Sequence, residues 1–184
     1  MDPKIVAIVV VVIVAILAMA WIVLQRRRTE ALRRRFGPEY DRTLREQGPG
    51  KAESVLAERE KRVEKFHIRD LAVDERERFV TAWREVQARF VDDPNAAVAD
   101  ADQLVARLMQ ARGYPVSDFE QRAADISVDH PRVVDNYRAA HEIALRQRRG
   151  DATTEDLRNA VIYYRSLFDD LLQTKTARDT REVA

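Results

Sequence analysis

The 184-residue sequence contains no cysteine. This absence excludes disulfide bonds, thiolate metal sites and a cysteine nucleophile, and it fits a reducing compartment without requiring one. Glycine and proline are also scarce, with five and six residues, and the glycines do not form a glycine-rich loop. The phosphate-binding fingerprints that depend on such loops are therefore excluded.

Charge is abundant but unevenly distributed. Asp, Glu, Lys and Arg make up 34% of the chain, and the frequent Ala, Leu, Arg and Glu are typical of helices. The net charge is +1, yet residues 1–35 hold seven basic and two acidic residues, which leaves 25 basic and 29 acidic residues after them. A nucleic-acid-binding domain usually shows the opposite balance. Nucleic acid is therefore an unlikely partner.

A long apolar run follows a short N-terminal tail, residues 1–4. Residues 5–24 contain no charged side chain. A helix of this length would extend ~30 Å, the thickness of the hydrocarbon core of a bilayer. Trp21 lies near its end, where an amphipathic ring would meet headgroups. The run predicts a single transmembrane helix over 5–24.

A cleaved signal peptide is the alternative interpretation of this run. Ala18-Met19-Ala20 has the small-x-small form of a cleavage site. Three features favour an uncleaved anchor instead: Lys4 is the only basic residue before the run, the run continues to Leu24, and arginines follow at once.

Six arginines follow the apolar run within eleven residues. By the positive-inside rule they place the N-terminus outside and the domain in the cytoplasm of a single-pass protein of the cell membrane. They also suit contact with anionic headgroups of a lipid bilayer. A nucleic-acid arm is less favoured, because the domain behind it is acidic. The predicted membrane-interface residues are Trp21, Arg26, Arg27, Arg28, Arg33, Arg34 and Arg35.

Residues 25–50 are predicted to be a basic juxtamembrane segment and linker. Within it, Pro38 can open a short helix, and Gly48-Pro49-Gly50 marks a break. Residues 51–73 are dense in charge and have only a thin apolar stripe, which predicts a charged stalk helix.

Residues 74–173 carry start and stop signals for about five amphipathic helices. Capping boxes are predicted at 74–77 and 117–120, a helix is expected to start at Pro131, and Thr153 or Thr154 is expected to cap the last one. Such short helices must pack together to be stable. The fold class is therefore all-α: a transmembrane helix, a compact antiparallel bundle and a frayed tail, 174–184. The expected core residues are Phe79, Trp83, Phe90, Leu108, Tyr137, Tyr164 and Phe168.

No group of residues in the sequence has the pattern of a catalytic or metal-binding site. His130 and His141 are eleven residues apart, ~16 Å along a helix, too far to share a metal ion. Asp169 and Asp170 are neighbours on a helix and should diverge by ~100°. We therefore expect no enzyme activity, no catalytic residue, no cofactor and no metal.

Three stretches carry a resemblance: "RRRFGPEYDRTL" (33–44), "ERFVTAWREVQARFVDDP" (77–94) and "ARGYPVSDFEQRAADISVDHPRVVDNYRAAH" (111–141). Together they resemble an uncharacterised family of small bacterial proteins, variously labelled hypothetical or secreted. The resemblance implies one hydrophobic N-terminal helix followed by a helical domain, and it implies no activity. Ala72-Val73 depart from the Ser-Pro helix start expected there.

These observations favour a membrane-anchored helical interaction or scaffold module with a protein partner of unknown identity. The alternative is an extracytoplasmic domain, anchored or secreted, that is associated with the cell envelope. The position of residues 74–184 relative to the membrane would distinguish the two.

Overall fold

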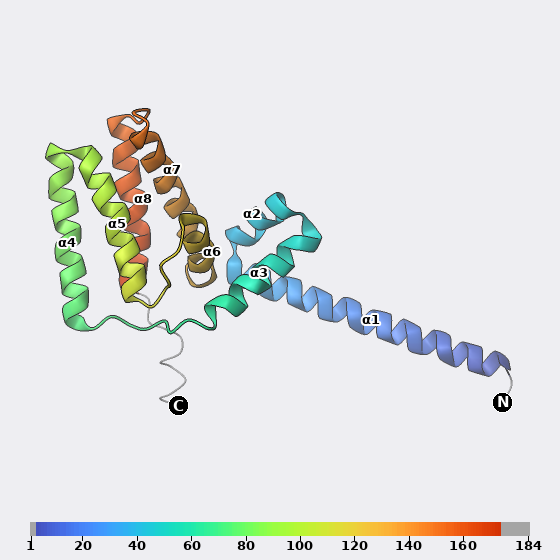
Figure 1. The fold of residues 1–184 in the computed structure, drawn as a ribbon. Helices are drawn as coiled ribbons and strands as arrows, with labels where there is room; N and C mark the ends of the chain where they lie inside the picture. Colours follow the sequence, from blue (N-terminus) through green and yellow to red (C-terminus); the bar gives the residue numbers. More distant parts are fainter. Residues whose placement is uncertain (1–2, 174–184) are drawn as a thin grey trace. The chain divides into compact units, whose positions relative to one another are not determined.

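The computed structural model describes residues 3–173, with the side chains of residues 12–173 (Figure 1). This part of the chain contains helices and no strand, so the prediction of an all-α protein is confirmed. The predicted tail 174–184 and the first two residues of the predicted tail 1–4 lie outside the described residues. The chain divides into two compact units, residues 1–56 and 57–184.

The first unit is built from α1 (Pro3–Phe36), α2 (Pro38–Gln47) and the beginning of α3 (Pro49–Val63). Gly37 separates α1 from α2 and has a φ of 48°, a left-handed conformation that glycine adopts without strain. Pro38 occupies the first turn of α2, as predicted. The reversal at Gly37 packs α2 against the C-terminal part of α1.

The prediction of a transmembrane helix is wrong. Within residues 12–173, no helix combines the length and the apolar character that crossing a membrane requires. The α1 helix continues without a break into the arginines up to Phe36. The predicted orientation assumed a spanning helix and stays a prediction from sequence.

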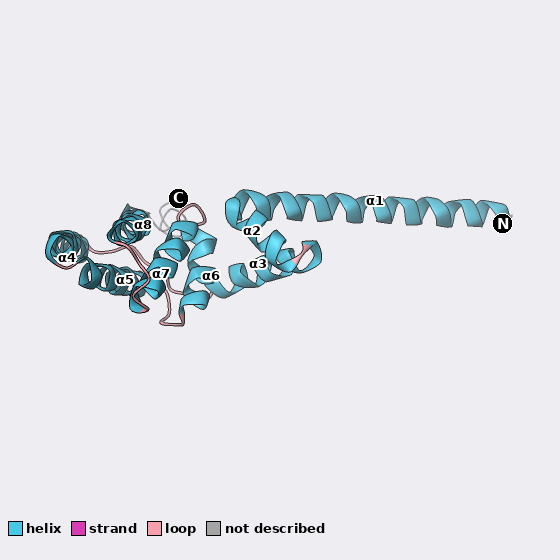
Figure 2. Ribbon diagram, turned by 90° about the horizontal axis from the view of Figure 1, so that it is seen from above, coloured by secondary structure: helices cyan, strands magenta, loops and turns pink. Residues whose placement is uncertain are grey.

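The described part of the second unit, residues 57–173, contains the end of α3 and five further helices: α4 (Val73–Asp92), α5 (Pro94–Ala111), α6 (Phe119–Asp129), α7 (Val134–Arg148) and α8 (Thr154–Gln173). The α4 helix packs against α5, α5 against α8, and α8 against α7, as Figures 1 and 2 show. The short α6 helix packs on α7. The predicted helical bundle is confirmed.

Several helices begin at other residues than predicted. The α4 helix starts at Val73, and Glu75 rather than Glu77 accepts a hydrogen bond from the preceding backbone, at 2.9 Å from Ala72 N. Asp118 caps α6 by accepting from Gln121 N at 2.9 Å. The helix predicted from Pro131 begins at Val134, after a turn. Thr153 caps α8 as predicted, because its hydroxyl accepts from Asp156 N at 3.2 Å.

Of the stalk helix predicted over 51–73, residues 51–63 are helical as part of α3, whereas residues 64–72 are not helical. The α3 helix ends at Val63, and the chain then runs against the end of α5, where Arg69 N donates to the carbonyl of Arg112 at 2.9 Å. Gly113 has a φ of 98°, and a Cβ there would lie 2.2 Å from the carbonyl oxygen of His67. The absence of a side chain at Gly113 permits this close approach.

The core of the second unit matches the predicted stripes. Trp83, Leu108, Tyr137, Tyr164 and Phe168 are buried. Phe79 and Phe90 are partly buried and pack against the same cluster. Small residues on α5, Ala97 and Ala101, are fully buried and let neighbouring helices approach closely.

Candidate functional site

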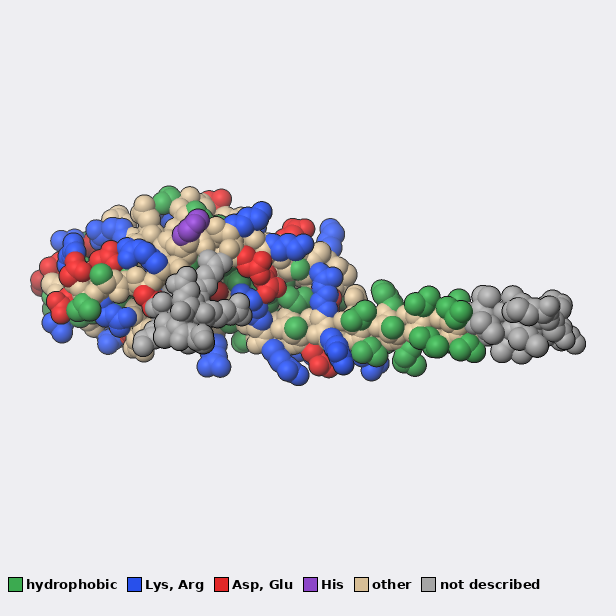
Figure 3. Space-filling view, turned by 90° about the horizontal axis from the view of Figure 1, so that it is seen from below, with side chains coloured by type: hydrophobic (Ala, Val, Ile, Leu, Met, Phe, Trp, Pro, Cys, Tyr) green, Lys and Arg blue, Asp and Glu red, His purple; other side chains and the backbone are tan. Residues whose placement is uncertain are grey.

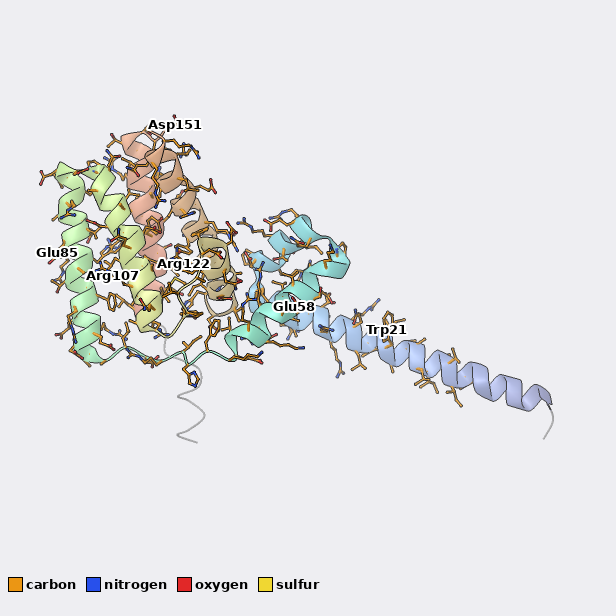
Figure 4. The ribbon with its side chains drawn as sticks, viewed as in Figure 1. Trp21, Glu58, Glu85, Arg107, Arg122 and Asp151 are labelled. Atoms are coloured by element: carbon orange, nitrogen blue, oxygen red, sulfur yellow. The ribbon has the colours of Figure 1, made fainter. Side chains whose placement is uncertain are left out.

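The largest exposed apolar surface described is on α1. Ten large apolar side chains between Val12 and Leu24 are exposed, and Figure 3 shows hydrophobic side chains covering this part of the helix. Trp21, whose side chain projects from α1 in Figure 4, is 66% exposed. Soluble monomers rarely leave so much contiguous apolar surface in water, so this surface indicates a contact site.

The structure separates the six predicted interface arginines into two groups. Arg26, Arg27 and Arg28 are exposed and follow the apolar stretch after Gln25, and none has an ion pair or hydrogen bond among the described residues. Arg33, by contrast, donates to Asp41 at 3.3 Å, and its guanidinium lies 5.3 Å from the ring centre of Tyr40. These contacts hold the reversal between α1 and α2.

The other two arginines of the second group also have partners. Arg34 pairs with Glu30 at 3.7 Å, one helical turn away. Arg35 takes part in a further interaction within the chain. Three of the six predicted interface arginines therefore have partners inside the protein.

A small polar network joins α1 to the other helices of the first unit. Glu53 of α3 accepts hydrogen bonds from Thr29 at 2.5 Å and from Tyr40 at 3.4 Å. Burial and the neighbouring Glu53 carboxylate raise the pKa of the Tyr40 hydroxyl. The tyrosine therefore stays protonated and acts as a donor that orders the junction of the three helices.

A second polar cluster lies inside the bundle. Tyr164 of α8 donates to Asp102 of α5 at 3.0 Å, and burial raises the pKa of this tyrosine. Burial also raises the pKa of Tyr137 to about 12, and the charge of Arg122 partly opposes the shift. The Tyr137 hydroxyl lies beside the Arg122 side chain but makes no hydrogen bond of normal geometry in the described part of the chain. Both tyrosines are uncharged near neutral pH.

His141 borders this cluster. Its ring stacks on Phe119 with centroids 3.6 Å apart, and burial lowers its pKa. His141 is half-buried. A neutral imidazole held against an aromatic ring contributes packing, and Nδ1 is buried without a hydrogen-bond partner among residues 12–173.

His130 lies in a third cluster, near the end of α8. Its Nδ1 is 2.5 Å from an Asp170 carboxylate oxygen. Asp169 instead contacts Arg165 at 3.2 Å, so the two neighbouring aspartates diverge as predicted. Tyr114 donates to Asp129 at 2.8 Å beside this histidine. The contact with Asp170 ties the turn before α7 to α8, and the hydrogen bond of Tyr114 ties the loop before α6 to the end of α6.

No three His, Asp or Glu side chains among residues 12–173 are grouped so that they could hold a metal ion. Two shallow surface grooves lie on α4 and α5 rather than at the histidines. One has a volume of about 340 Å³, with Phe79, Ala82 and Leu104 among its apolar lining and Arg78 and Arg107 among its charged lining. The other, about 520 Å³, runs along α4 past Glu85, and Figure 4 labels both Glu85 and Arg107.

Comparisons with protein family models, with curated proteins and with solved structures found no match to the chain. The resemblance to a family of small bacterial proteins therefore stays a prediction from sequence. The arguments for function rest on the surfaces described above.

Proposed function

We propose that the protein is a helical interaction module that attaches to a lipid surface through α1 and presents its bundle to a protein partner. The observation that carries the proposal is the exposed apolar stretch from Val12 to Leu24, followed directly by arginines. The proposal concerns attachment to lipid and assigns no crossing of a bilayer.

The distribution of apolar side chains around α1 favours lipid over a protein groove. Val12, Ile13 and Val14 are successive residues, each at least 50% exposed, and successive helical residues point ~100° apart. Trp21, Ile22 and Val23 repeat the pattern about two and a half turns later and are at least 41% exposed. A protein groove buries one stripe of a helix, whereas acyl chains can contact its whole circumference.

The groove between α4 and α5 supports the second part of the proposal. Its apolar floor and charged rim have the composition of a surface that accepts an amphipathic segment. Arg107 is exposed on the rim, so its charge is available to an acidic side chain of a partner. The bundle beneath has a well-packed core and would serve as a rigid support.

Vesicle flotation of the full-length chain tests attachment. The protein is mixed with vesicles of phosphatidylcholine, a zwitterionic lipid without net charge (called uncharged vesicles below), while a mild detergent is removed, and the floating fraction is measured. Leu17, 63% exposed on α1, is replaced by Glu. We expect wild type to float and Leu17→Glu to bind at least about tenfold more weakly, because a carboxylate is costly in acyl chains.

The matched control is Val91→Glu, the same type of change at an exposed apolar residue of the bundle. This variant should float like wild type. If wild type does not float, or if Leu17→Glu floats equally well, attachment through α1 is refuted.

The partner surface is tested by affinity capture with the full-length chain on vesicles. Arg107→Glu reverses a charge on the groove, and Arg84→Glu reverses an exposed charge on α4 that lines neither groove. We expect Arg107→Glu to lose proteins that wild type and Arg84→Glu both retain. If both variants capture the same proteins in equal amounts, the groove is not the partner surface.

A further inference from the structure

We infer that Arg26, Arg27 and Arg28 form a binding site for anionic lipid headgroups, and that Arg33, Arg34 and Arg35 do not belong to it. This inference rests on the proposed attachment of α1 to lipid. It names the class of lipid that the attachment prefers and the three residues that set the preference.

The first argument is the position of the three arginines. They begin two residues after Leu24, the last residue of the apolar stretch, so their Cα atoms lie ~3–6 Å along the axis from its end. Headgroup phosphates lie at the boundary of the hydrocarbon core, and the long arginine side chain can reach along the helix to that boundary. Trp21, an aromatic residue suited to the same interface, lies about one turn before them.

The second argument is their direction. Three consecutive helical residues point ~100° apart, so their guanidinium groups are spread around the axis instead of gathering on one face. A single phosphate could not engage all three. A layer of phosphates around the helix could, since each arginine would meet a different headgroup and can bind its phosphate with two hydrogen bonds.

The third argument is the contrast with the second group of arginines. Arg33 is held by Asp41 and Tyr40, Arg34 faces Glu30, and Arg35 has an interaction within the chain. These residues lie seven positions beyond Arg26 to Arg28, ~10 Å along the axis. At physiological ionic strength that distance exceeds the Debye length of ~8 Å, so their attraction to a charged surface is strongly screened.

Flotation of full-length protein with two kinds of vesicle tests the inference. Uncharged phosphatidylcholine vesicles are compared with vesicles that also contain 30% phosphatidylserine. A basic residue near an anionic surface strengthens binding ~5-fold. We expect wild type to prefer the anionic vesicles ~100-fold at physiological salt, and Arg26→Gln/Arg27→Gln/Arg28→Gln to lose most of this preference while still floating with uncharged vesicles.

Two single variants provide a matched comparison, each removing one exposed charge from α1. Arg27→Gln should weaken binding to anionic vesicles ~5-fold. Arg34→Gln, whose side chain is 83% exposed, should change it less than ~2-fold. Both substitutions are at exposed positions and leave the contacts of Arg33 intact. Both variants should therefore fold like wild type, and any difference in vesicle binding reports the lost charge.

The outcomes separate the two proposals. Flotation of wild type with uncharged and anionic vesicles alike, or equal effects of Arg27→Gln and Arg34→Gln, overturns the inference and leaves attachment standing. Absence of flotation with the uncharged vesicles refutes attachment through the apolar stretch itself, whether or not the protein floats with the anionic vesicles.

Discussion

The indole ring of Trp83 stacks on the ring of Phe168, with centroids 4.6 Å apart and planes inclined by 25°. Trp83 belongs to α4 and Phe168 to α8, so the stack joins the first and last helices of the bundle. Both side chains are buried, and their contact adds an aromatic interaction to the area that they remove from water.

Replacement of Trp83 by alanine should lower the free energy of unfolding by ~3–5 kcal/mol, because it leaves a large cavity beside Phe168. Urea denaturation followed by circular dichroism measures the loss. Trp21→Ala, at an exposed position, is the control and should leave the bundle unchanged. A loss below ~1 kcal/mol for Trp83→Ala would contradict its role in the core.

Loss of the hydroxyl group should change the stability of the bundle differently at its two buried tyrosines. Tyr164→Phe removes a donor to the Asp102 carboxylate and should destabilise the bundle by ~1.5–3 kcal/mol. Tyr137→Phe removes a buried hydroxyl that lies beside Arg122 but makes no hydrogen bond of normal geometry in the described chain, so it should be neutral or stabilising. Thermal unfolding of both variants against wild type measures the difference, and equal losses would show that Tyr137 also has a partner.

Gly113 should not tolerate a side chain. Its φ of 98° strains any other residue, and a Cβ would overlap the carbonyl oxygen of His67. We expect Gly113→Ala to cost at least ~2 kcal/mol in the free energy of unfolding. Gly50 lies in α3 with open space around it, so Gly50→Ala should instead stabilise by ~0.5–1 kcal/mol. Denaturation midpoints of the two variants that shift in the same direction would contradict this account.

The start of α8 predicts a loss of stability in acid. Hydrogen bonds from the backbone and side chain of Thr153, together with Arg146, lower the pKa of Asp156 from 3.8 to about 2. The lowered pKa means that the folded state favours the carboxylate. Its stabilising effect is complete above the unfolded pKa and is lost as the pH falls from about 4 through about 2.

The measurement is the urea midpoint between pH 5 and pH 2 for wild type and Asp156→Asn. The variant should start from a lower midpoint and show a shallower decline over that range. Asp151→Asn is the control, because Asp151 is exposed and lies only near Arg149, at 3.6 Å. A decline as steep in Asp156→Asn as in wild type would show that other carboxylates account for it.

The sequence predicted the bundle core well because helical periodicity reports burial directly. Trp83, Tyr164 and Phe168 follow from spacing alone. Helix starts were less accurate, since a cap depends on contacts outside the helix. Glu75 caps the start of α4, and Arg69 in the preceding loop holds its carboxylate at 2.7 Å. Helix-start patterns in the sequence do not include a contact with a residue of the preceding loop.

The candidate site was only partly predictable. Arg26 to Arg28 and Arg33 to Arg35 look equivalent as sequence, and both groups were assigned to one interface. The reversal at Gly37 distinguishes them, because it brings Asp41 and Tyr40 back to Arg33. The transmembrane prediction was based on the length of the uncharged run over 5–24. Among the described residues, no helix is long and apolar enough to cross a membrane.

The order of helix packing has a consequence for how the bundle folds. The pairs α4–α5 and α7–α8 are neighbours in sequence, joined by short turns, so each can form as a local hairpin. The contact between α5 and α8 instead closes a loop that contains all of α6 and α7. Loop closure carries the larger entropic cost, so we expect docking of the two preformed hairpins to limit the folding rate. Substitutions at Asp102 and Tyr164, whose hydrogen bond joins α5 to α8, should then slow refolding most.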